Sequence, residues 1–116
     1  MTVLRIVANL SSPDPSTLAR FYSDLFGLDL PLDMGWITFL ETDAQQKVEL
    51  HIASEGGSGT ELPVISIEVD DLDAVLVRAK SLDSPPVYGP VTEPWGVRRF
   101  YLRDPAGTLI NILSHA

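Results

Sequence analysis

The sequence predicts an α+β domain in which two βαβββ repeats form a curved mixed sheet around a cleft, with the helices on the outer face. Three observations support this fold class. Each half of the chain shows one extended segment, one amphipathic helix and three further extended segments, in that order. A Gly/Ser-rich segment at 55–60 separates the halves. Neither half can bury both faces of its own sheet, so we expect the two repeats to pair.

The first repeat covers about residues 1–55. Apolar residues alternate with mixed ones over 3–10, which is typical of a strand. Asp14 is expected to cap a helix that begins at Pro15, and Gly27 is expected to end it. Three extended segments follow, with lengths typical of short strands, at 28–33, 35–42 and 46–54.

The second repeat covers about residues 61–116 and shows the same order of elements. A strand is predicted at 63–70, followed by a helix that Asp70 or Asp71 opens. Three further strands are predicted after this helix, at 86–92, 97–103 and 107–114.

Two connecting segments complete the prediction. Residues 104–107 read Asp-Pro-Ala-Gly, with proline and glycine at favoured positions of a type I turn. Glycine and serine make 55–60 the most flexible stretch of the sequence, because they restrict the backbone least. The length of the chain fits one domain, and we expect 1–116 to fold as a single unit.

Composition narrows the functional classes. The net charge of −8 disfavours nucleic acid as a partner, because the phosphate backbone would be repelled. There is no cysteine, hence no disulfide and no thiolate chemistry, which suits a reducing compartment, and we expect a cytoplasmic protein. No apolar run approaches the length of a membrane span, so a membrane partner is not expected either.

The predicted cleft is lined by side chains opposite the helix-packed faces of the strands. The first strand contributes Arg5, Val7 and Asn9. Its counterpart in the second repeat contributes Val64, Ser66 and Glu68.

The sequence resembles the vicinal oxygen chelate superfamily, which includes glyoxalase I, extradiol dioxygenases, fosfomycin-resistance transferases and bleomycin-binding proteins. Three segments carry the resemblance: 19–28, reading ARFYSDLFGL; 66–72, reading SIEVDDL; and 103–110, reading RDPAGTLI. These are mostly turn, cap and core residues, which specify architecture without specifying chemistry.

The resemblance also implies where a metal would bind. Enzymes of this superfamily typically place one ligand on the first and last strand of each repeat, and these positions fall on Arg5, Glu49, Val64 and Asn111. Only Glu49 is a recognised ligand, so we expect no metal and no cofactor. We expect the guanidinium of Arg5 to replace the lost cation in a partly buried pair with Glu49, next to Asn111.

Glu49 and His51 lie two residues apart and share one face of their predicted strand. Two interpretations follow from this spacing. In the first, Glu49 and His51 act together, either as an acid/base pair or as two ligands of a displaced metal. In the second, His51 is an inert histidine at the rim of the cleft.

Aromatic residues are concentrated in the strand-rich parts, and flat rings lining a cleft would suit an apolar ligand. Core packing explains most of these rings equally well. Trp95 is the exception that we assign to a ligand, because Pro94 and Gly96 place it in a loop. Arg98 and Arg99, beside Trp95, are a candidate patch for an anionic ligand, but two arginines on a strand are more often solvated or ion-paired, and this is what we expect.

The preferred prediction is a glyoxalase/bleomycin-resistance-like protein that binds a small, partly apolar molecule without metal and without transforming it. The alternative is a lyase, isomerase or dioxygenase-like enzyme with an atypical site on Glu49 and His51. The resemblance also implies a homodimer, which the linker would allow to be domain-swapped. The predicted ligand-binding residues are Arg5, Trp36, Glu49, His51, Ser66, Trp95, Phe100 and Asn111.

Overall fold

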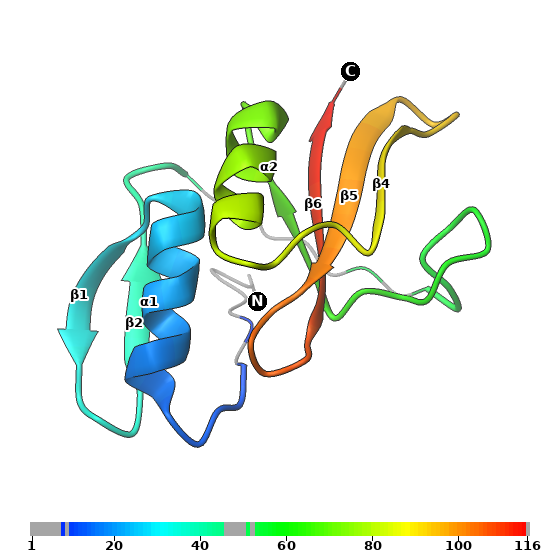
Figure 1. Ribbon diagram of the computed structural model, residues 1–116. Helices are drawn as coiled ribbons and strands as arrows, with labels where there is room; N and C mark the ends of the chain where they lie inside the picture. Colours follow the sequence, from blue (N-terminus) through cyan, green and yellow to red (C-terminus); the bar gives the residue numbers. More distant parts are fainter. Residues whose placement is uncertain (1–7, 9, 46–50, 52, 116) are drawn as a thin grey trace, which may run out of the picture.

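The computed structural model describes residues 8, 10–45, 51 and 53–115. Within them, two helices and six strands form a mixed α+β structure with two sheets (Figure 1). The helix α1 (Pro15–Phe26) lies against a two-stranded sheet, and α2 (Leu72–Ser81) lies over a four-stranded sheet. The two helices also pack against each other, which joins the two halves of the chain.

Helix α1 has the predicted ends. The side chain of Asp14 accepts the Thr17 N–H at 3.3 Å and the Thr17 hydroxyl at 2.6 Å, which satisfies a donor that the first turn leaves free. Pro15 occupies the first turn, where its missing N–H costs nothing. Gly27 ends the helix with φ of 68°, and its N–H donates to the carbonyl of Ser23.

Helix α2 resolves one of the alternatives left by the sequence. Asp71, not Asp70, is the N-cap, and its side chain accepts the N–H of Ala74 at 3.0 Å. Asp73 lies in the first turn, while Arg78 and Lys80 lie in the last, so these charges complement the helix dipole.

The second repeat has the βαβββ order that the sequence predicts. Its strands are β3 (Ile65–Glu68), β4 (Tyr88–Thr92), β5 (Val97–Arg103) and β6 (Leu109–His115), and their order in the sheet is β3-β6-β5-β4. β3 runs parallel to β6, whereas β5 is antiparallel to both neighbours. The sheet is therefore mixed, and β3 and β4 are its outer strands among the described residues.

In the first repeat, β1 (Asp29–Asp33) pairs antiparallel with β2 (Thr38–Glu41). Most of the strands predicted at 3–10 and 46–54 lies outside the described residues. The described part of the first repeat thus has the predicted helix followed by two of the three predicted strands.

The turn at 104–107 connects β5 to β6 and also ties the two repeats together. The carbonyl of Asp104 accepts the Gly107 N–H at 2.8 Å, as expected for this turn. One carboxylate oxygen of Asp104 accepts the N–H groups of Ala106 and Thr108, each at 2.9 Å. The other accepts the buried Tyr22 hydroxyl of α1 at 2.6 Å. Burial first, and this hydrogen bond second, raise the pKa of Tyr22, so the phenol remains a donor.

The hydrophobic core lies between the helices and the adjoining faces of the strands. Phe100 and Leu102 of β5 are fully buried there, as are Ile110 and Ile112 of β6. Phe100 therefore packs against the helices on the face away from the predicted cleft. The adjacent side chains of β5 point to the other face of the sheet. That Phe100 contacts a ligand stays a prediction, and its burial in the core is the observation that disfavours it.

Neither helix, among the residues the structure describes, is long and apolar enough to cross a membrane.

Candidate ligand-binding site

The face of the four-stranded sheet that the helices do not cover carries the candidate site. Phe100 and Leu102 point to the core, so the intervening residues Arg99, Tyr101 and Arg103 lie on this open face. The register places Tyr101 beside Asn111 and Arg103 beside Leu109. Residues 56–61, which precede β3, lie over part of this face.

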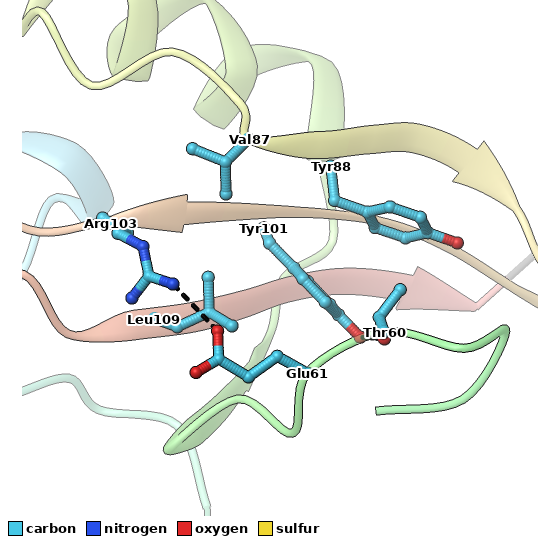
Figure 2. A pocket seen from close by; sticks show the side chains of 7 residues that line it. All are labelled: Thr60, Glu61, Val87, Tyr88, Tyr101, Arg103 and Leu109. Atoms are coloured by element: carbon cyan, nitrogen blue, oxygen red, sulfur yellow. Dashed lines mark hydrogen bonds and ion pairs between the residues drawn. The ribbon is translucent and has the colours of Figure 1, made fainter. Parts of the chain in front are cut away.

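A pocket of about 250 Å³ lies on the open face. Tyr88 and Tyr101 contribute adjacent rings, with centroids 4.9 Å apart and planes inclined by 41°. Figure 2 shows both rings extending along the pocket, with the Tyr101 hydroxyl beside Thr60. The pocket combines apolar and polar side chains from the loop before β3, from β4 and the residue before it, and from β5 and β6: Thr60, Glu61, Val87, Tyr88, Tyr101, Arg103 and Leu109.

An exposed ion pair lies at the pocket. The Nη2 of Arg103 lies 2.8 Å from the Oε2 of Glu61, and the two side chains are 48% and 65% exposed (Figure 2). The Nη1 of Arg103 also donates to the carbonyl of Gly107 at 3.0 Å. The guanidinium is therefore held by the backbone of the β5–β6 turn as well as by Glu61.

Arg99 forms the centre of a buried cluster next to the pocket. Its Nη2 lies 3.0 Å from the Oε2 of Glu93. Its guanidinium carbon lies 5.6, 5.0 and 4.9 Å from the ring centroids of Tyr88, Trp95 and Tyr101, within the range of cation–π attraction. Aromatic rings and a carboxylate together compensate the charge that burial would otherwise destabilise.

Glu93 receives further hydrogen bonds. The Ser58 hydroxyl donates to it at 2.7 Å and the Tyr88 hydroxyl at 2.8 Å. The Ser58 bond contributes most, followed by Tyr88 and the charge of Arg99, to a pKa of Glu93 that lies below its usual 4.5 despite the opposing effect of burial. Glu93 is therefore an ionised structural anchor and a poor proton acceptor near neutral pH.

The Gly/Ser segment is a docked loop, which corrects the prediction of a flexible linker. The carbonyl of Gly56 accepts Arg99 Nη1 at 2.7 Å and the Tyr101 hydroxyl at 3.1 Å. Thr60 closes the loop on itself by accepting the Gly56 N–H at its carbonyl, 2.9 Å away. Gly57 has φ of 83°, and a Cβ there would lie 2.8 Å from the Trp95 ring, so the loop needs glycine at this point.

Three predicted site residues lie on or beside the open face. Asn111 Nδ2 donates to the Ser66 hydroxyl at 3.1 Å, which joins β6 to β3. The Oδ1 of Asn111 is buried and has no hydrogen-bond partner among the described residues. Trp95, 52% exposed in the β4–β5 turn, lies over Arg99. That these residues contact a ligand stays a prediction.

The other predicted site residues are not brought together. Trp36 is 72% exposed in the β1–β2 turn, far in Figure 1 from the β4–β5 turn that carries Trp95. His51 is exposed, and its proposed partner Glu49 lies outside the described residues, as does Arg5. Both the Glu49–His51 pair and the Arg5–Glu49 pair stay predictions.

The two neighbouring arginines, Arg98 and Arg99, are both ion-paired, which is one of the two states expected for them. Arg98 lies on the helix side of β5, where its Nη1 is 2.8 Å from Asp73 of α2. Arg99 is paired with Glu93 on the open face.

A protein-family model describes the relatives of this chain. The model of the Glyoxalase/Bleomycin resistance protein/Dioxygenase superfamily matches residues 4–112. The chain belongs to this superfamily. No curated protein matches it.

Solved structures of similar fold agree with this membership. TioX from Micromonospora sp. ML1 is 24% identical, with a TM-score of 0.68 over 97% of this chain and 96% of that one. A lactoylglutathione lyase from Agrobacterium tumefaciens is 23% identical, with a TM-score of 0.61 over 90% of this chain and 88% of that one. An integron cassette protein of V. Cholerae is 20% identical, with a TM-score of 0.60 over 98% and 100%. At these identities the likeness concerns the fold.

The donor set of this superfamily member does not fit the metal site that the resemblance implies. Val64 has no lone pair to offer and is 70% exposed. Asn111 has only an amide oxygen to offer, which is a weak ligand for the divalent ions of this superfamily. The described residues hold no group of three His, Asp or Glu side chains that would bind a metal elsewhere. We therefore derive no chemistry through a metal.

Most residues of the pocket were not among the predicted ligand-binding residues. Tyr88 and Tyr101 were equally compatible with core packing, and Thr60, Glu61, Val87, Arg103 and Leu109 carried no motif. The alternation of β5 is the signal that would have found two of them, because Tyr101 and Arg103 share a face once Phe100 is assigned to the core.

Proposed function

We propose that this protein binds a small, partly apolar molecule on the open face of its four-stranded sheet, without a metal. The pocket of about 250 Å³ beside the Tyr88–Tyr101 ring pair is the observation that carries this proposal. Its volume suits a ligand of one or two rings, and pockets of this type combine apolar walls with a few polar groups that fix orientation.

Tyr88 is partly exposed and offers ring surface to a ligand, while the buried Tyr101 ring packs against it and holds it in place. Tyr101 is 2% exposed, and its hydroxyl bonds to both Thr60 and the Gly56 carbonyl. Tyr88 is held through its hydroxyl by Glu93. Rings that are already fixed lose little conformational entropy when a ligand binds, so binding is stronger for the same contact area.

We propose binding without a metal because of the side chains at the family's ligand positions. The two family positions that the structure describes hold Val64 and Asn111, and neither offers the imidazole or carboxylate that a divalent ion prefers. Binding would then depend on ring contacts and hydrogen bonds, and the polarisation of substrate oxygens that metal-dependent relatives achieve would be missing.

The test is calorimetric titration with 2-naphthamide, an uncharged two-ring probe. We expect saturable binding at one probe per chain. Val87→Trp fills the pocket from an exposed lining position and should abolish this binding, whereas Val77→Trp, at a similarly exposed position on α2, should leave it intact. No saturable binding to the wild type, or equal binding to both variants, would refute the proposal.

We also propose that the protein acts in the cytoplasm as a homodimer. The β1–β2 sheet supports a second copy as partner, because Leu32 and Phe39 are paired in register and exposed on the same face. Leu30 and Met34, in and next to β1, are further exposed apolar residues in this part of the chain. A second chain packed on this sheet would bury these residues.

A further inference from the structure

The pocket contains an ion pair whose two members are held very differently. Resting on the proposed function, we propose that the ligand carries a carboxylate, and that this group replaces Glu61 as the partner of Arg103. The ligand class is therefore an aromatic or similarly flat apolar acid, whose ring lies against Tyr88 while its carboxylate binds the guanidinium of Arg103.

Arg103 is the fixed member of the pair. Its Nη1 donates to the Gly107 carbonyl at 3.0 Å, and Gly107 belongs to the turn that Asp104 stabilises through two backbone N–H groups. Its backbone is part of β5, in register with Leu109. A guanidinium held by a strand and a turn presents its remaining N–H groups in a constant direction, which favours recognition of a carboxylate.

Glu61 is the replaceable member. It lies between the docked loop and β3, its side chain is 65% exposed, and its described side-chain hydrogen bond is the one to Arg103 at 2.8 Å. Exposed ion pairs contribute little net stability, because solvent screens them and each long side chain loses rotamer freedom. Glu61 can therefore rotate into solvent at small cost.

The exchange also conserves charge at the site. One carboxylate leaves Arg103 and another takes its place, so the guanidinium keeps a partner throughout. The ligand's carboxylate reaches the site attached to a ring that the pocket binds independently, which raises its local concentration next to Arg103. A cationic ligand would instead have to displace Arg103 from Glu61, and the backbone contact of Arg103 opposes this.

The test compares two isosteric probes, 2-naphthoate and 2-naphthamide, by calorimetric titration of the full chain. Both have the same rings, and only the first carries a charge. We expect 2-naphthoate to bind roughly fivefold more tightly than 2-naphthamide, since a pair this exposed supports a modest difference. The difference should shrink with added salt, because screening weakens a charge contact at a solvent-exposed site.

Two variants and a control assign the difference to the ion pair. Arg103→Gln should bind both probes equally, and Glu61→Gln should bind 2-naphthoate more tightly than the wild type because the competing carboxylate is gone. Arg98→Gln removes an arginine from the same strand but from the helix side, where it pairs with Asp73, and should change neither affinity.

The outcomes separate this inference from the proposed function. Saturable binding of both probes with equal affinity, or a preference for 2-naphthoate that survives Arg103→Gln, overturns the carboxylate subsite and leaves the pocket standing. Tighter binding of 2-naphthylmethylammonium than of 2-naphthoate also overturns it. If none of the probes binds, the proposed function itself fails.

Discussion

Arg99 and Glu93 form an ion pair, with Nη2 and Oε2 3.0 Å apart and with 5% and 3% of their side chains exposed. Arg99 holds the loop through the Gly56 carbonyl and contacts the ring of Trp95. Glu93 accepts the hydrogen bond of the Tyr88 hydroxyl. The open face of the sheet is therefore organised around a buried charge pair, and several of its measurable properties depend on this pair.

Removing one member of the pair should destabilise the protein disproportionately. Arg99→Met leaves the Glu93 carboxylate buried without its countercharge, and Glu93→Leu leaves the guanidinium in the same position. We expect the double variant to lose less stability than the sum of the two single losses, measured from urea unfolding midpoints. Additive losses would contradict a direct interaction between the two residues.

Acidification should weaken the fold through Glu93. Its pKa in the folded state lies below the unfolded value of 4.5, chiefly through the Ser58 hydrogen bond, so its stabilisation is complete above about 4.5. The contribution is lost as the pH falls through the lower folded value. Through this group, the melting temperature should stay level above about pH 4.5 and decline as the pH falls further.

A matched variant isolates this contribution from the other carboxylates. Glu93→Gln cannot ionise, so its melting temperature should fall less steeply over the same pH range, although it starts lower. Asp14 and Asp33 also have a lowered pKa and remain in both proteins. Parallel slopes for the two proteins would show that Glu93 does not contribute.

Two aromatic residues should differ sharply in their effect on stability. Phe100→Ala removes a fully buried ring and should cost about 3–5 kcal/mol. Trp95→Ala removes a half-exposed ring over Arg99 and should cost about 1 kcal/mol. Chemical denaturation measures both, and a large loss for Trp95→Ala would make it a structural residue.

Chelation should leave the protein unchanged. The family positions at Val64 and Asn111 offer no good ligand, so purified protein should carry no stoichiometric divalent ion, and EDTA should not alter its melting temperature. A bound metal would stabilise the folded state by mass action. A drop of several degrees on adding EDTA would therefore reveal a site and reopen the enzymatic alternative.

Sedimentation velocity at micromolar concentration tests the homodimer. The expected species has twice the 12.7 kDa mass of one chain. Leu32→Glu places a charge on the exposed face of the β1–β2 sheet and should yield the monomer, whereas Val77→Glu on α2 should not. A monomeric wild type ends the proposal, and a dimer unaffected by Leu32→Glu places the interface elsewhere.

The sequence by itself determined both described helices, the order of elements in the second repeat and the family. Local rules decide where α1 begins and ends, because Asp14, Pro15 and Gly27 act through their own backbone or that of near neighbours. The same holds for the turn at 104–107 and for the βαβββ order of the second repeat. These signals involve residues close in the chain, which a single sequence displays directly.

The tertiary structure alone decided which rings form the pocket and what the Gly/Ser segment does. Phe100 and Tyr101 are adjacent and both aromatic, and only the position of the helices sends the first into the core and the second to the open face. The loop at 56–60 is docked because Arg99, more than 40 residues later, reaches its carbonyls. The composition of a segment indicates how flexible its backbone is in isolation. Long-range hydrogen bonds and buried charges decide whether the segment is still flexible in the folded chain.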